Sequence, residues 1–405
     1  MFAFLKEYNT RSEKALLALL IIAICQETLF IYPVAIISHL SSVLSGIRYV
    51  IFPITYLILT IIALQKPEAT RYIRVSDFLL IAFFSLYVFF SLGLNPKQTE
   101  AVLEILRPIF LPCIPFLFLG LCVKIDSVSM DALGKWSCCA IIITSVYRIL
   151  YQAPDVDWEY NYNMGAAYAL LPNILIAIDY LFRTKKKLIP IVCSVVGVFY
   201  LFAMGTRGPI VIAFSLLFIR ILTSINLKRF WMALITVLFG SIVIWLSTSP
   251  ALINILAFLG NILSSMGLSS RATDFGVSGE FISNTTGRDE ITEILLSKLG
   301  EMPLLGYGVM GENRFDILSA HNLFLEAIFD YGYFFGGLIL LFFIVITVKS
   351  ILKTRGKPMQ QWIIIWTIYV FVKGFFGGGV LRPENFILIG ICLRSIRMKL
   401  SEIQY

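Results

Sequence analysis

Apolar residues occur along this chain in long blocks separated by short polar segments. A helix needs roughly 20 apolar residues to cross a hydrocarbon core of about 30 Å, and runs of this length recur throughout. About twelve such runs are found, at residues 15–38, 48–65, 77–94, 102–123, 136–152, 164–182, 188–205, 208–224, 229–249, 322–348, 360–376 and 384–398. Because backbone polar groups in lipid must be bonded within their own segment, we expect these runs to be helices.

Composition agrees with this pattern. Of the 405 residues, 58% are hydrophobic and only 14% are charged, whereas charged residues make up about 25% of an ordinary soluble domain. The sequence therefore predicts an all-α polytopic membrane protein that forms a single integral membrane domain over residues 1–405.

One long polar segment, residues 250–320, interrupts the pattern between the ninth and tenth predicted spans. Residues 252–263 within it are mostly apolar, which predicts a short interfacial helix, while residues 269–283 are small and polar and predict irregular structure. We expect the large loop to contain short helices and to carry the functional site.

The distribution of basic residues orients the chain. If residues 1–14 are cytoplasmic, every inner connection is basic, as the positive-inside rule requires. Both termini are then cytoplasmic and the long loop is extracytoplasmic. The net charge of +8 is explained by the cytoplasmic loops, so it indicates no nucleic-acid partner.

Some basic residues oppose this rule, and most of them are arginines. The set that falls outside, or in the outer half of a span, is Arg48, Lys97, Arg107, Arg148, Arg207, Arg271, Arg288, Lys298, Arg314, Lys373 and Arg382. Arginine's planar fork suits bidentate binding of phosphate or carboxylate, so the set favours an anionic ligand at the outer surface. The alternative for each residue is contact with lipid headgroups or pairing with a nearby acid.

Three of these arginines stand at distinctive positions. Arg207 lies in the segment Gly205–Pro209, which predicts a tight turn between two spans. Arg288 follows Thr286, and Asp289 completes a capping box that predicts a helix start. Free backbone N–H groups at a helix start attract anions, so Arg288 marks a candidate anion site. Arg271 lies in the loop between the other two.

The loop ends at His321, one of only two histidines in the chain. A neutral imidazole at this place can accept a proton from a hydroxyl group. Asn322 and Glu326 lie four residues apart, where we expect one helical face to orient a polar substrate or the ring. A purely structural role for this histidine is the alternative. The seven cysteines all fall in predicted spans, and with two histidines the sequence indicates neither a metal site nor a cofactor.

These residues together resemble the Wzy-type polysaccharide polymerases and the related O-antigen ligases of bacterial envelopes. The resemblance covers about residues 161–337 and is strongest at three places, Thr206-Arg207-Gly208, Thr286-Gly287-Arg288 followed by Pro303 and Gly306-Tyr307-Gly308, and His321-Asn322 followed by Glu326 and Gly332. It implies a GT-C-like membrane fold and a metal-independent, inverting glycosyltransferase without a cofactor. The implied location is the bacterial plasma (inner) membrane, with the active site on the extracytoplasmic side.

The resemblance also implies partners and roles. The donor would be an oligosaccharide on undecaprenyl pyrophosphate, with Arg207 and Arg288 at the pyrophosphate and Arg271 at either substrate. His321 would act on the acceptor hydroxyl, beside Asn322 and Glu326. Membrane lipid, a flippase and a chain-length regulator are the implied partners.

Two alternatives stay open at this point. An O-antigen ligase would use the same donor but transfer the glycan to lipid A core, although His321–Glu326 followed by Phe329–Gly332 looks more like the polymerases. A secondary transporter would also be basic and polytopic, and Glu27 and Asp179 are intramembrane acids that could couple to ions.

Overall fold

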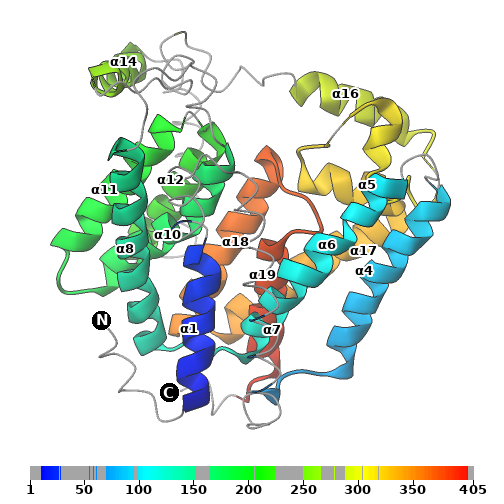
Figure 1. The fold of residues 1–405 in the computed structure, drawn as a ribbon, viewed down its shortest axis with the longest axis horizontal. Coiled ribbons are helices and arrows are strands. Elements are labelled where there is room, and N and C mark those ends of the chain that lie inside the picture. Colours follow the sequence, from blue (N-terminus) through cyan, green and yellow to red (C-terminus); the bar gives the residue numbers. More distant parts are fainter. Residues whose placement is uncertain are drawn as a thin grey trace. The chain divides into compact units, whose positions relative to one another are not determined.

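The computed structural model describes residues 11–26, 70–94, 99–150, 164–204, 206–224, 250–265, 288–302, 304–317 and 319–399, with isolated positions 28, 54, 58, 61 and 278. Every regular element within these ranges is a helix (Figure 1). The all-α prediction is therefore confirmed for the described part of the chain.

Five segments among the described residues are long and apolar enough to cross a membrane. They are α4 (Val75–Leu94), the run Val102–Cys122, α10 (Met164–Arg183), α17 (Leu323–Lys353) and α18 (Pro358–Phe376). The other helices are α1 (Arg11–Gln26), α5 (Thr99–Glu104), α6 (Leu106–Pro108), η5 (Ile109–Cys113), α7 (Ile114–Cys122), α8 (Ser127–Leu150), α11 (Leu188–Ala203), α12 (Arg207–Ser224), α14 (Pro250–Ser265), α16 (Arg288–Leu299), η6 (Gly311–Phe315) and α19 (Pro383–Arg397). This is the architecture of a helical membrane protein.

Most predicted spans coincide with helices. The expected interfacial helix at 252–263 is found as α14, and the expected helix start near Thr286 is found as α16, which begins at Arg288. The predicted span at 229–249 lies outside the described residues, and so do nearly all residues of the span at 48–65, of the second half of the span at 15–38 and of the segment 269–283. The count of about twelve spans therefore stays a prediction.

Helix α8 begins earlier than its apolar run predicts, at Ser127 instead of residue 136. Asp126 and Ser129 cap its start reciprocally, because Asp126 Oδ1 accepts from Ser129 N at 2.9 Å and Ser129 Oγ accepts from Asp126 N at 2.7 Å. A capping box stabilises a polar first turn independently of hydrophobicity, so the helix extends beyond the apolar block.

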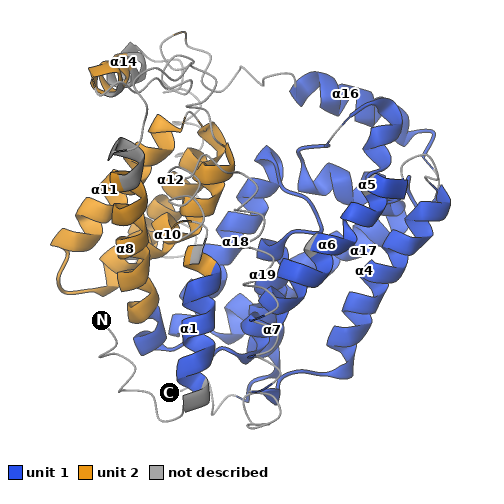
Figure 2. Cartoon of the chain, viewed as in Figure 1, with its two compact units in different colours: residues 1–23, 45–130, 287–405 blue, residues 24–44, 131–286 orange. Residues whose placement is uncertain are grey.

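The chain divides into two compact units (Figure 2). Unit 1 comprises residues 1–23, 45–130 and 287–405, and unit 2 comprises residues 24–44 and 131–286. Each unit is described by itself below.

In unit 2, α10 packs against α11 and α12. Asp179 on α10 is fully buried and lies 2.6 Å from Arg183 Nε and 3.3 Å from Arg220 Nε on α12. A buried carboxylate requires such partners, because an unpaired charge is costly inside a protein. Asp179 therefore serves to link α10 and α12.

In unit 1, α19 packs against α7, α17 and α18. Near its C-terminal end Arg397 forms a two-armed ion pair with the buried Asp77 of α4, with both N–O distances at 2.6 Å. Arg394 donates to the carbonyl oxygen of Leu121 at 2.7 Å, which ties α19 to α7. Bidentate pairs of this kind fix geometry as well as charge.

Helix α17 is interrupted at Gly332, whose φ of 77° and ψ of 169° are not helical. The carbonyl oxygens of Phe329 and Asp330 at the interruption accept hydrogen bonds from Tyr307 N at 2.9 Å and Gly308 N at 3.0 Å. Gly306 faces Gly332 so closely that a Cβ on either would collide with the backbone of the other segment. The segment 304–309 thus closes the interruption with its own backbone.

The glycines at this crossing predict a stability effect. Gly332→Ala should destabilise the fold by roughly 2–4 kcal/mol, because it combines a positive φ with a backbone collision that rigid neighbours cannot relieve. Thermal unfolding of the purified protein in detergent would measure the loss.

Gly337→Ala is the matched control. It lies further along the same helix, and a Cβ there meets nothing within 4 Å, so this variant should unfold like the wild type. Equal stability of the two variants would contradict the close approach of the two backbone segments at Gly306 and Gly332.

Candidate functional site

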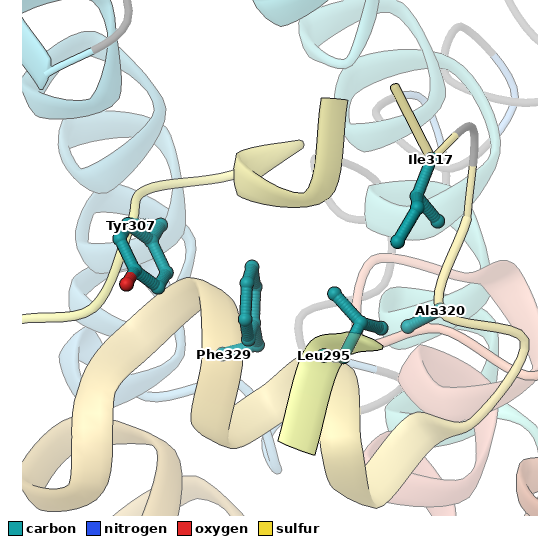
Figure 3. Close-up of a cluster of buried hydrophobic side chains, with 5 residues drawn as sticks. All are labelled: Leu295, Tyr307, Ile317, Ala320 and Phe329. Carbon is teal, nitrogen blue, oxygen red and sulfur yellow. The ribbon is translucent and has the colours of Figure 1, made fainter. Parts of the chain in front are cut away.

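A small hydrophobic core joins α16, α17 and the connection between them (Figure 3). Its buried members are Leu295, Tyr307, Ile317, Ala320 and Phe329. Burial of a leucine, isoleucine or phenylalanine side chain is worth about 1.5–3 kcal/mol, so the connection is held firmly against α17. The core packs α16 and the end of the connection together in unit 1.

Helix α4 holds the same connection from another side. The hydroxyl of Tyr87 donates to the carbonyl oxygen of Asp330 at 2.8 Å and also contacts that of Leu305. Ser91 Oγ accepts from Val309 N at 2.9 Å. The backbone groups of the connection are therefore bonded although it lies against apolar helices, as burial requires.

His321 lies at the end of this connection in a strained conformation. Its φ of 50° is in the left-handed region, which costs a residue with a side chain roughly 1–2 kcal/mol. Its backbone N–H donates to Ser319 Oγ at 3.2 Å, and the residue is partly buried. Strained backbone of this kind is found preferentially where a side chain must be aimed.

The electrostatic surroundings keep the imidazole of His321 neutral. Partial burial lowers its pKa below the ordinary value of 6.5, and the positive charges of Arg288 and Arg382 lower it further. At neutral pH the ring is therefore unprotonated, the form that can accept a proton. The sequence-predicted residues His321 and Arg288 are thus brought into electrostatic contact within unit 1.

Arg288 is the first residue of α16, where the backbone N–H groups of the first turn have no partner within the helix. Asp289 and Glu290, both exposed, complement the helix dipole in this turn. A guanidinium at a helix N-terminus is favourable when an anion binds between the two.

Asn322 and Glu326 have structural contacts. Asn322 is the N-cap of α17, so it precedes the helix and does not share a helical face with Glu326 as predicted. The Oδ1 of Asn322 accepts hydrogen bonds from Phe324 N at 3.0 Å and Leu325 N at 3.1 Å. Glu326 Oε1 accepts from Val380 N at 2.9 Å. Asn322 therefore fixes the helix start directly after His321, while Glu326 reaches the connection between α18 and α19.

Two buried carboxyl groups at this site were not singled out from the sequence. Glu312 and Asp330 are each 3% exposed and lie within hydrogen-bonding reach of each other. Burial raises the pKa of Glu312, and a hydrogen bond between two carboxyls requires a proton on one of them. Asp330 Oδ1 also accepts from Gly311 N at 3.3 Å. The pair joins η6 to α17 next to the interruption.

Two predicted site residues are not part of unit 1. Arg207 belongs to unit 2, where it is the first residue of α12 after a short turn from α11, as its glycine-flanked position predicts. Arg271 lies outside the described residues. Arg382 was only one of many outward-facing bases in the sequence, and its effect on His321 depends on tertiary packing.

A scan against protein-family models and searches of curated proteins and of solved structures find no significant match. The resemblance to Wzy-type polymerases therefore stays a prediction. Among the described residues, no group of three or more histidine, cysteine or acidic side chains is arranged to hold a metal ion. The only observations that bear on function are therefore the residues of the site and their geometry.

The titration of His321 can be measured directly, because the chain has only one other histidine, His39. In a His39→Gln background, the rate of modification by diethyl pyrocarbonate should rise with pH and have its midpoint below the ordinary value of 6.5. Arg288→Ala should move this midpoint upwards, because it removes a positive charge that disfavours protonation. Mass spectrometry of the modified peptide would give the rate.

Protein unfolded in detergent provides the control, and its midpoint should return to about 6.5, the ordinary histidine value. A midpoint above that value in the folded protein would contradict the electrostatic description of the site.

Proposed function

We propose that this protein is a polysaccharide polymerase, a glycosyltransferase that joins glycan repeat units carried on undecaprenyl pyrophosphate at the outer face of a bacterial plasma membrane. The observation that carries the proposal is the neutral imidazole of His321 beside Arg288 at the start of α16. A base and an anion site at one place are what glycosyl transfer from a pyrophosphate donor requires.

The chemistry follows from these two groups. The acceptor hydroxyl oxygen attacks the anomeric carbon of the donor while the bond from that carbon to the pyrophosphate oxygen breaks. The bonding electron pair leaves with the pyrophosphate, and the hydroxyl proton passes to the imidazole of His321. A single displacement of this kind inverts the anomeric centre.

Charge stabilisation comes from the helix start. Negative charge develops on the pyrophosphate oxygen as the bond breaks, and preorganised donors aimed at such charge are worth several kcal/mol. The N–H groups at the start of α16 and the guanidinium of Arg288 are donors of this type. This leaving group can therefore be stabilised by protein groups alone.

The transporter alternative has less support from the described residues. Asp179 is paired with two arginines in unit 2. The interruption in α17 has the appearance of a discontinuous transporter helix, but the carbonyl oxygens of Phe329 and Asp330 already accept backbone N–H groups. Both features are therefore accounted for by contacts within the fold.

The proposal predicts chain growth by the purified protein. Incubation with lipid-linked repeat units in nanodiscs should give a ladder of longer glycans, and chelation of divalent metals by EDTA should not change it. His321→Ala and Arg288→Ala should each reduce product formation by at least about 100-fold, the scale of lost base or charge-stabilising groups. Gel electrophoresis of the lipid-linked products would measure this.

Retained thermal stability of both variants is the required control, since a misfolded variant would also be inactive. Transfer to lipid A core without a ladder would replace the polymerase by a ligase. Wild-type activity of His321→Ala would remove this residue from the mechanism, and absence of any transfer by the wild type would overturn the proposed function.

A further inference from the structure

The connection between α18 and α19, residues 377–382, packs on the first turns of α17. Glu326 Oε1 accepts from Val380 N, and a Cβ on Gly379 would lie 2.7 Å from the same oxygen. Leu323, two residues after His321, lies close to Gly374 and Gly378. A Cβ added to Gly374 would lie 3.1 Å from the Cβ of Leu323, and one added to Gly378 would lie 3.5 Å from it. This connection therefore lies directly beside the start of the helix that follows His321.

Arg382 is the last residue of this connection, and hydrogen bonds fix the position of its backbone. It is the N-cap of α19, and its carbonyl oxygen accepts from Asn385 N at 3.0 Å. The side chain of Asn385 donates to the carbonyl oxygens of Gly379 and Val380 at 2.7 and 2.8 Å. The backbone of Arg382 is thus fixed, whereas the residue itself is exposed.

Two basic residues, Lys373 and Arg382, lie near this connection, together with the carboxyl groups of Glu326 and Glu384. Lys373 on α18 forms an ion pair with Glu384 on α19, and both side chains are mostly buried. Among the described residues, Arg382 forms no ion pair within 4 Å, although the charges of Glu326 and Glu384 act on its guanidinium. An exposed arginine on a fixed backbone, beside His321, is suited to an anionic ligand.

We propose that Arg382 is a second phosphate-binding residue of this site, acting together with Arg288 beside His321, and that Glu326 is its positioning residue. The identity of the ligand, a lipid-linked pyrophosphate, rests on the proposed function. Two guanidiniums match the two phosphoryl groups of a pyrophosphate better than the single one of a monophosphate. Arg382 thereby confers preference for the diphosphate form of the donor.

This assignment changes the interpretation of Glu326. Its carboxylate is directed to the backbone of Val380 and so acts on the substrate only through Arg382. Gln at this position retains an oxygen that can accept the Val380 N–H, whereas Ala does not. The conservative variant should therefore rescue the loss.

Ligand binding also has a consequence for His321. The positive charges of Arg288 and Arg382 lower the pKa of the imidazole in the empty site. A bound pyrophosphate neutralises both guanidiniums, which raises the basicity of the ring when the donor is in place. The imidazole of His321 is therefore a stronger base with the donor bound than in the empty site.

Binding can be tested independently of activity with the full-length protein in nanodiscs and farnesyl pyrophosphate as a soluble probe. Calorimetry should show tighter binding of farnesyl pyrophosphate than of farnesyl monophosphate. Arg382→Ala should weaken pyrophosphate binding by about 10- to 100-fold, the range for a lost charge-assisted hydrogen bond, and should reduce the preference over monophosphate. Glu326→Ala should weaken it similarly, with affinity restored in Glu326→Gln.

Lys298→Ala is the matched control, because it removes one positive charge from the same unit at a residue paired with Glu301. It should bind the probe like the wild type. In the His39→Gln background, farnesyl pyrophosphate should raise the modification midpoint of His321, and this shift should shrink in Arg382→Ala.

The outcomes separate the two proposals. If the wild type binds the probe and forms glycan ladders while Arg382→Ala keeps full affinity and preference, the role of Arg382 is overturned and the proposed function stands. If the wild type binds neither phosphate probe and forms no product, both are overturned. Displacement of the probe by phosphatidylglycerol at equal concentration would assign Arg382 to lipid headgroups and also overturn the inference.

Discussion

The site depends on the crossing of two backbone segments at Gly306 and Gly332. An interrupted helix leaves carbonyl oxygens without partners, and here Tyr307 and Gly308 supply the missing N–H groups. The same contact fixes the connection that leads to His321, and the hydrophobic core around Phe329 and Leu295 adds α16 to it. One set of backbone hydrogen bonds therefore both completes α17 and determines where the site residues lie.

The strain at His321 is supported from both sides. Asn322 fixes the helix start after it, and the connection before it is bonded to α4 and α17. Because both flanks are held, the left-handed backbone cannot relax without breaking several contacts. A side chain held in this way keeps its orientation when a ligand approaches, which reduces the entropy lost on binding.

The sequence predicts the helices of this protein well because long apolar blocks have few other stable structures in lipid. It also predicts the start of α16, since capping residues act locally. The interruption of α17 was not predicted, because Gly332 lies inside an apolar run that hydrophobicity alone makes continuous. The early start of α8 was missed for the opposite reason, a polar first turn stabilised by its cap.

The sequence indicates only those residues of the candidate site that stand next to local signals. His321 and Arg288 are distinctive residues next to local signals, so the sequence indicates both. Arg382 and Glu312 become prominent only through contacts between segments that are distant in sequence, and no local pattern records these contacts. Glu326 is a candidate from the sequence as well, but its partner, the backbone of Val380, is visible only in the folded chain.

The interruption at Gly332 also affects how deeply the first turns of α17 lie in the membrane. At 1.5 Å per residue, a continuous helix of the 31 residues from Leu323 to Lys353 would measure roughly 46 Å, well beyond a hydrocarbon core of about 30 Å. The part after Gly332 alone is long enough to cross that core, so the preceding turns are free to lie at the headgroup level. The lipid-linked glycan of the proposed function would have the boundary between its apolar tail and its hydrated sugars at this same level.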